Sequence, residues 1–224
     1  MARVLKEPEE RKNEIMDAAQ NLFESKGYEE TSVNDIIQKV GIAKGTFYYY
    51  FKSKEEIMDA VVDREMDIQL QHIMKIIDDK SCNALIKLKN IIRDNVKRYS
   101  RRIELLGYLH KKENIVMHQK SLVQSVKKFA PVLSKIIQQG IDEKLFNTRY
   151  PLEVTEFLLV GMNFMFDPSI FSWSNEEYAT RMEAFAEVLE NTLIVQKGEF
   201  SFLNLLANQM YGVNQCKVWG SDIG

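Results

Sequence analysis

Lysine and tyrosine side chains are concentrated in residues 39–54, which read KVGIAKGTFYYYFKSK. The stretch contains four lysines and no acidic residue, and its five aromatic residues are consecutive. Ammonium groups and phenol hydroxyls donate hydrogen bonds to phosphate oxygens, and aromatic rings rest against thymine methyls or sugars. These side chains therefore indicate a surface that could bind nucleic acid.

Helical geometry divides the aromatic run into two groups. Successive residues of a helix are about 100° apart, so five consecutive side chains cannot all be buried. Phe47 and Phe51 are four residues apart and share a face, whereas Tyr48, Tyr49 and Tyr50 occupy the remaining arc. We predict that the phenylalanines face a core and the tyrosines face solvent. The alternative is a small helical core in which the tyrosines are half-buried against a neighbour and the lysines are ordinary solvated charges.

Short helices must position these side chains. The spacing of apolar residues predicts helices at about 9–26, 33–40 and 44–50. Ser32 with Asp35 is a capping box that opens the second of them, and Gly41 ends it. Two short helices joined by a tight, glycine-containing turn are typical of a helix-turn-helix motif, here at about residues 32–51.

Residues 9–60 resemble, in order and without gaps, the DNA-binding domain of TetR-family transcriptional regulators. The resemblance is carried by Phe23, Gly27-Tyr28, Thr31-Ser32-Val33, Asp35-Ile36, Gly41-Ile42, Lys44-Gly45-Thr46-Phe47-Tyr48, Phe51 and Ser53-Lys54-Glu55. It implies a two-fold dimer whose third helix enters the major groove of pseudo-palindromic operator DNA, with half-site centres ~34 Å or more apart. It also implies a larger helical C-terminal domain that binds a small molecule.

The resemblance further implies which residues contact the operator. The matching positions are Thr31, Lys44, Gly45, Thr46, Tyr48, Tyr49, Tyr50 and Lys54. Ala43 stands where the family often has a capping serine, a loss of about 1 kcal/mol, and Tyr50 stands where it often has histidine. Lys54 adds an argument from charge, because a cation in the first turn of a helix opposes the macrodipole unless the lysine and the helix start both face a phosphate.

Helical periodicity continues beyond residue 60 without a flexible linker. No Gly or Pro occurs between residues 46 and 106, so the helix opened by a capping box at Ser53 and Glu56 can run to about residue 77, a length of ~36 Å. Further helices are predicted at about 83–100, 103–113, 119–141, 151–166 and 175–196. We expect an all-α protein with a three-helix DNA-binding domain at 1–53 and a helical ligand-binding and dimerisation domain at 54–224.

The second domain contains a segment, FLLVGMNFMF at 157–166, that is apolar on every side. Such a helix is covered by its own domain on one face and by another chain on the other, which favours a homodimer. The expected interface residues are Leu158, Gly161, Met182, Phe185, Leu189 and Leu193. The alternative is that this is the central helix of a monomeric bundle.

A ligand pocket is also expected in this domain. Its candidate lining residues are Leu106, Leu109, Phe129, Leu133, Met162 and Met165. Methionine adapts to varied shapes, so the expected effector is a small apolar or aromatic molecule. The basic residues Lys97, Arg98, Arg101 and Arg102 either bind an anionic head group or form a solvated helix end.

No catalytic or metal-binding pattern accompanies these features. His72, His110 and His118 lack the spacing of a metal pair, and no phosphate-binding loop of the G-x-x-x-x-G-K-[ST] type occurs. Two cysteines, Cys82 and Cys216, are too few for a disulfide framework, and no apolar run approaches the ~20 residues of a membrane span. We expect a cytoplasmic protein with no membrane segment, cofactor, metal or enzymatic activity.

Three functional classes follow from the sequence. The first is a DNA-binding regulator, most often a repressor, that a ligand releases from its operator by changing the separation of the paired DNA-binding domains. The second is a helical small-molecule-binding protein with no DNA-binding role, and the third is an enzyme. The tyrosine and lysine surface favours the first class, because neither a carrier nor an enzyme needs it.

Overall fold

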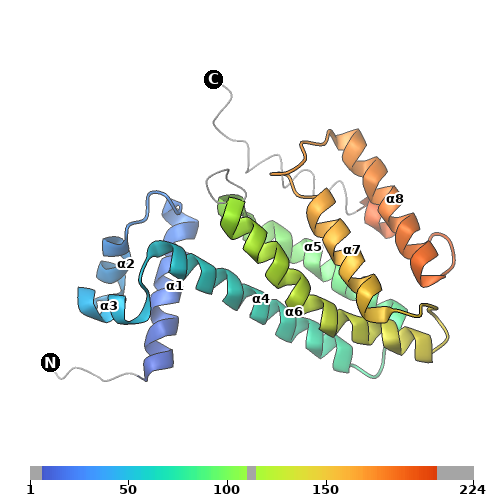
Figure 1. Ribbon diagram of the computed structural model, residues 1–224, viewed down its shortest axis with the longest axis horizontal. Coiled ribbons are helices and arrows are strands. Elements are labelled where there is room, and N and C mark those ends of the chain that lie inside the picture. Colours follow the sequence, from blue (N-terminus) through green and yellow to red (C-terminus); the bar gives the residue numbers. More distant parts are fainter. Residues whose placement is uncertain (1–6, 110–114, 206–224) are drawn as a thin grey trace. The chain divides into compact units, whose positions relative to one another are not determined.

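The structure, a computed structural model, describes residues 7–109 and 115–205, without the side chains of residues 96 and 99–109. Within this part of the chain every regular element is helical (Figure 1). The helices are α1 (Pro8–Lys26), α2 (Val33–Val40), α3 (Lys44–Tyr50), α4 (Lys54–Asp78), α5 (Ala84–Leu109), α6 (Ile115–Asp142), α7 (Pro151–Met165) and α8 (Asn175–Leu193). The all-α prediction is confirmed. None of the helices in the described ranges is long and apolar enough to cross a membrane.

The chain divides after Asp67 into two compact units. The N-terminal unit contains α1, α2, α3 and the first part of α4. Its core is built from Ile15, Ala19, Phe23, Ile36, Phe47, Phe51, Ile57, Met58 and Val61, all of them buried. Because α4 supplies Ile57, Met58 and Val61 to this core, the compact unit extends past residue 53, where the sequence placed the domain boundary.

Capping interactions define where the short helices begin. The predicted box at Ser32 is confirmed, since Ser32 Oγ accepts from the Asp35 N–H at 3.1 Å and the Asp35 carboxylate accepts from the Ser32 N–H at 2.9 Å. At the start of α4, Ser53 Oγ accepts from the Glu56 N–H at 3.2 Å, as predicted. The Glu56 carboxylate, however, accepts from the Lys52 N–H at 2.6 Å, one residue before the expected donor.

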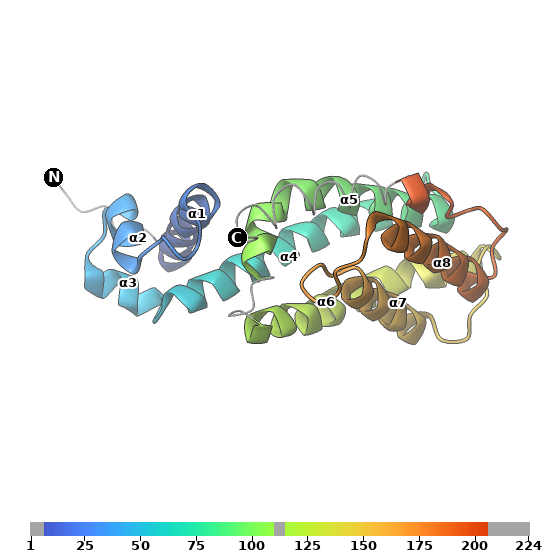
Figure 2. The ribbon, with the colours of Figure 1, turned by 90° about the horizontal axis from the view of Figure 1, so that it is seen from above.

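The C-terminal unit contains the rest of α4 and the helices α5 to α8. Both views show α6 beside α7, with α8 next to α7 (Figures 1 and 2), and α6 also packs against α5. The sequence predicted a break between helices at residues 100–103, and this prediction is wrong. Arg101 and Arg102 are good helix formers, and no Gly or Pro interrupts the hydrogen-bond ladder there, so α5 runs through.

The C-terminal end of α6 lies under the ring of Phe146. The chain reverses at Lys144, whose φ is 62°, and the N–H groups of Leu145 and Phe146 donate to the Gly140 carbonyl at 2.8 and 3.0 Å. A Cβ atom at Gly140 would lie 2.0 Å from Cδ2 of Phe146, far inside van der Waals contact. Only glycine fits this position while the ring stays in place.

Residues 194–205, called here the C-terminal strap, fold back onto the helices of the C-terminal unit. Phe200 and Leu203 are buried, and the buried carboxylate of Glu190 accepts hydrogen bonds from the N–H groups of Gly198 and Phe200, each at 2.9 Å. On α5, Lys89 pairs with Glu199 of the strap. The strap therefore joins the end of α8 to α5.

Candidate nucleic-acid interface

Helix α3 presents phenylalanines inward and tyrosines outward. Phe47 is 0% and Phe51 2% exposed, whereas Tyr48 is 46% and Tyr49 79% exposed. Tyr50 is half-buried. The predicted division of the aromatic run is therefore confirmed for Tyr48 and Tyr49 and holds in part for Tyr50.

Ring contacts fix the outward side chains of α3. The Tyr48 ring meets the edge of the buried Phe47 ring at 5.3 Å between centroids, and Tyr49 and Tyr50 form a T-shaped pair at 5.0 Å. Lys44 Nζ lies 6.0 Å from the Tyr48 ring centroid. These contacts limit the rotamers of the tyrosines, so the surface that they form is pre-organised.

Six of the residues expected to contact an operator lie on α3: Lys44, Gly45, Thr46, Tyr48, Tyr49 and Tyr50. Lys44 and Gly45 are exposed and Thr46 is half-buried. Ala43, at the N-cap position, provides no side-chain hydrogen bond, as its residue type requires. The helix thus combines phenol and threonine hydroxyls with a cation on a short, exposed segment.

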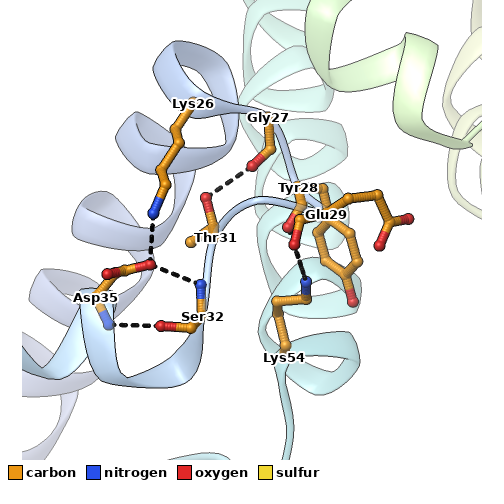
Figure 3. Close-up of polar contacts among 8 residues, drawn as sticks. All are labelled: Lys26, Gly27, Tyr28, Glu29, Thr31, Ser32, Asp35 and Lys54. Atoms are coloured by element: carbon orange, nitrogen blue, oxygen red, sulfur yellow. Dashed lines mark hydrogen bonds and ion pairs between the residues drawn. The ribbon is translucent and has the colours of Figure 1, made fainter.

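An ion pair joins helix α2 to the end of α1. Lys26 Nζ lies 2.8 Å from the Asp35 carboxylate, which also accepts from the Ser32 N–H (Figure 3). The Lys26 hydrogen bond, followed by the bonds from Ser32, lowers the pKa of Asp35 to about 2. Asp35 is therefore ionised at neutral pH, and its contacts hold the start of α2 against the end of α1.

Thr31 and Lys54, the two other expected contact residues, are engaged in the turn between α1 and α2 (Figure 3). Thr31 is 1% exposed, and its hydroxyl donates to the Gly27 carbonyl at 2.7 Å. Lys54 Nζ donates to the Tyr28 carbonyl at 2.8 Å and to the Glu29 carbonyl at 3.4 Å. Sequence reasoning missed the Lys54 contacts because they join residues that are far apart in the chain, and it missed the Thr31 bond although that bond spans only four residues.

A polar cluster holds α1 against α4 further along. Arg64 on α4 pairs with Asp17 at 2.7 Å and donates to the Gln20 side-chain oxygen at 2.9 Å. Gln20 in turn donates to Glu65 at 3.2 Å. Helix α4 is therefore attached to α1 and its following turn at two places within the N-terminal unit.

The residues expected to line a ligand pocket are only partly described. Phe129 is buried in the C-terminal unit, and Leu133, Met162 and Met165 are half-buried there. The side chains of Leu106 and Leu109 lie outside the described residues.

Some of the residues expected at a dimer interface are buried inside the protomer, and the others are half-buried. Met182, Leu189 and Leu193 on α8 are buried inside the protomer, so they cannot reach a partner, which corrects that part of the sequence-based set. The error arises because an apolar seam on a helix does not reveal which neighbour it packs against. Leu158, Gly161 and Phe185 are half-buried. Exposed apolar side chains on these two helices are Phe157, Val160 and Phe164 on α7 and Val188 on α8.

The histidines have structural partners. His72 on α4 lies 2.5 Å from Asp94 on α5, and the buried His118 on α6 lies 2.9 Å from Asp167 after α7. His110 lies outside the described residues. Within the described ranges, no group of His, Cys, Asp and Glu side chains is arranged to hold a metal ion.

Comparison with known proteins gives consistent matches to both units. Residues 15–61 match the family described as bacterial regulatory proteins, tetR family, and residues 101–188 match the tetracyclin repressor-like C-terminal domain. The chain is 27% identical over 161 residues to YfiR, an uncharacterised HTH-type transcriptional regulator of Bacillus subtilis, covering 69% of this chain and 77% of that protein. It spans only 41 to 42% of the length of other curated relatives.

Solved structures share the fold. RolR, in complex with the ligand resorcinol, has a TM-score of 0.62 at 15% sequence identity. The match covers 90% of this chain and 94% of the RolR chain. The regulator FadR of Bacillus subtilis, in complex with stearoyl-CoA, has a TM-score of 0.54 at 18% identity, over 88% of this chain and 96% of its own.

Proposed function

Because the chain belongs to the TetR family of bacterial transcriptional regulators, we propose that it is a repressor that a small apolar or aromatic ligand releases from its operator. The observation that carries this proposal is the outward face of α3, where Tyr48 and Tyr49 are exposed beside Lys44 and Thr46. Neither a ligand carrier nor an enzyme needs such a face. A cytoplasmic location follows from the proposed role.

The side chains of α3 contribute to DNA binding in two ways, through charge and through contacts that discriminate between sequences. Lys44 contributes charge, which attracts any DNA through its phosphates and is screened by salt. Thr46, Tyr48 and Tyr49 reach base edges, thymine methyls or sugars, and they carry the discrimination between sequences. Gly45 brings the backbone close to the DNA, since no neighbouring atom lies within 4 Å of the position that its Cβ would take.

The proposed ligand site lies in the C-terminal unit. Phe129, Leu133, Met162 and Met165 supply apolar surface on α6 and α7, two helices that lie side by side. The ligands of the similar structures are an aromatic diol in RolR and a long-chain acyl thioester in FadR. Resorcinol contains an aromatic ring and stearoyl-CoA a long alkyl chain, which supports an apolar or aromatic effector for this chain.

The first prediction tests DNA binding and its release together. The full chain is expected to retard DNA from upstream of its own gene in a gel shift, and to prefer it over random DNA by a factor of about 10³ or more. Resorcinol and stearoyl-CoA serve as probes of release. Equal affinity for operator and random DNA would contradict sequence-specific binding, and a probe that binds free and DNA-bound protein equally well would exclude coupling through that ligand.

We propose that the protein binds DNA as a two-fold dimer through α7 and α8. Phe157, Val160 and Phe164 lie at i, i+3 and i+7, which places them on one face of α7. An exposed apolar stripe of this kind is a common feature of protein interfaces. Gly161 lies beside it and has no neighbouring atom within 4 Å of its Cβ position, so there is room for another backbone. Val188 on α8 is exposed as well.

The second prediction concerns this dimer. The wild-type chain is expected to be dimeric by light scattering at micromolar concentration, and Phe157→Glu is expected to weaken the dimer roughly 30-fold or more by placing a charge in the apolar contact. Ile86→Glu, which alters an exposed apolar residue of α5, is the matched control and should remain dimeric. A monomeric wild type, or two variants that dissociate alike, would rule out this interface.

A further inference from the structure

Three aromatic rings and a guanidinium group form a continuous stack between α7 and α8. The ring of Phe164, on α7, meets the Phe171 ring edge to face at 5.5 Å between centroids. Phe171 in turn lies parallel to Trp173 at 4.8 Å, with 9° between the ring planes. The guanidinium carbon of Arg181, on α8, lies 3.4 Å from the Trp173 ring centroid. We call these four side chains the ring stack.

Hydrogen bonds hold the end of the ring stack that lies toward α8. The indole N–H of Trp173 donates to the Met165 carbonyl at 2.8 Å, at the end of α7 where helix carbonyls lack intrahelical partners. Arg181 Nη1 donates to the Glu177 carbonyl at 2.9 Å. A planar guanidinium can stack on a ring while its N–H groups bond elsewhere, so both side chains are fixed by two contacts each.

Phe164 is the end of the ring stack that lies on α7, and it is exposed. Its side chain is 46% exposed and completes the apolar stripe that Phe157 and Val160 begin. A side chain that rotates in solvent loses this freedom when a partner covers it, and the loss weakens association. Because Phe171 already contacts the Phe164 ring, part of that freedom is lost before any partner binds. The ring stack therefore pre-organises the stripe.

The ring stack also reaches an exposed face of α8. Arg181 and Val188 are seven residues apart, which places them on one face of this helix. Val188 is 49% exposed, and Ala184 between them is exposed as well. Aromatic residues and arginine are enriched at protein interfaces relative to the rest of the surface. The contacts of the stack thus connect the stripe of α7 to a face of α8 with the composition of an interface.

We propose that the ring stack lies in the contact between two copies of this chain and holds Phe164 in the orientation that the partner meets. This inference rests on the proposed dimer through α7 and α8. It adds Phe171, Trp173 and Arg181 to that interface, as residues that position Phe164 and are covered with it. A stack that served only to close the loop between the helices would need no exposed ring on α7.

Fluorescence of Trp173 tests whether the ring stack is covered in the dimer. The chain has two tryptophans, so Trp219→Phe leaves Trp173 as the only one. When this full-length variant is diluted, its emission is expected to move to longer wavelength over the concentration range in which sedimentation shows dissociation, because water then reaches the indole. Adding Phe157→Glu should move both transitions to higher concentration together. Emission that stays constant while the dimer dissociates would place the stack outside the interface and overturn the proposal.

Substitutions within the ring stack test the pre-organisation. Phe171→Leu keeps an apolar side chain but removes the ring beside Phe164, and it is expected to raise the dimer dissociation constant about tenfold, since each dimer orders two copies of Phe164. Arg181→Met should raise it as well. The matched control is Arg93→Met, which removes a guanidinium 4.5 Å from the Phe202 ring and should leave the constant unchanged. Wild-type constants in both stack variants would contradict the positioning of Phe164.

The two measurements separate this inference from the proposed dimer. A chain that sediments as a monomer at micromolar concentration would refute the dimer, and the role of the ring stack with it. A dimer whose dissociation changes neither the Trp173 emission nor its sensitivity to Phe171→Leu would refute the role of the stack alone. The emission experiment leaves all four members of the stack intact, so it decides the question even if Phe171→Leu fails to fold.

Discussion

Replacing Phe47 by alanine is expected to unfold the N-terminal unit and abolish operator binding. Phe47 is fully buried, and its ring lies 6.4 Å from that of Phe51 at the centre of the unit. Removing such a ring from a packed core costs about 3 to 5 kcal/mol. Small domains are stable by only about 5 kcal/mol, so most of the stability would be lost. Circular-dichroism melting and a gel shift on the full chain measure the two effects.

Tyr48→Ala is the matched comparison, because it removes a ring one residue away on the exposed side of α3. It should leave the melting of the N-terminal unit nearly unchanged and weaken operator binding by roughly 1 to 3 kcal/mol, with much less loss on random DNA. Thr46→Ala should behave alike. If Tyr48→Ala melted the unit as strongly as Phe47→Ala, the tyrosines would be core residues and α3 would lose its proposed role.

Gly140→Ala is expected to destabilise the C-terminal unit by about 3 kcal/mol, although alanine is the better helix former. The added methyl would lie 2.0 Å from Cδ2, 2.5 Å from Cε2 and 2.6 Å from Cγ of Phe146. The Phe146 ring is 3% exposed, so moving it aside would cost some of its own packing contacts. Thermal unfolding monitored by circular dichroism measures the loss.

A double-mutant cycle tests the cause of this loss. Phe146→Ala is destabilising by itself, but it removes all three of the atoms that the new methyl would meet. In that background Gly140→Ala should be neutral or stabilising by up to about 1 kcal/mol, because only helix propensity remains. If Gly140→Ala still cost about 3 kcal/mol in the Phe146→Ala background, the steric clash of the new methyl would be with a residue other than Phe146.

Local sequence signals predicted the N-terminal unit well. Its helices begin and end within one residue of the predicted positions, because Ser32 and Gly41 act on backbone groups only a few residues away. The break predicted in α5 was wrong for the opposite reason. A polar stretch such as Tyr99 to Arg102 contains no residue that must end a helix, and periodicity alone cannot distinguish a solvated turn of helix from a loop.

The candidate site was predictable where it depends on the geometry of one helix. The four-residue spacing of Phe47 and Phe51 was enough to separate buried rings from exposed ones. The contacts of Lys54 were not predictable in this way, since they join residues that only the folded unit brings together. The same limit applies to α8, where the spacing of Met182 and Leu189 identified a buried face but not the element that covers it.

The C-terminal strap affects the order in which the two units can fold during translation. Domains generally fold as the chain emerges, beginning at the N-terminus, and the N-terminal unit has its whole core once residue 67 has been made. The C-terminal unit must wait for Phe200 and Leu203, which are synthesised more than a hundred residues later. Until then Glu190 on α8 and Lys89 on α5 lack their partners in the strap. A chain that has not yet reached the strap therefore has an incomplete C-terminal unit, and it is more prone to aggregation than the finished protein.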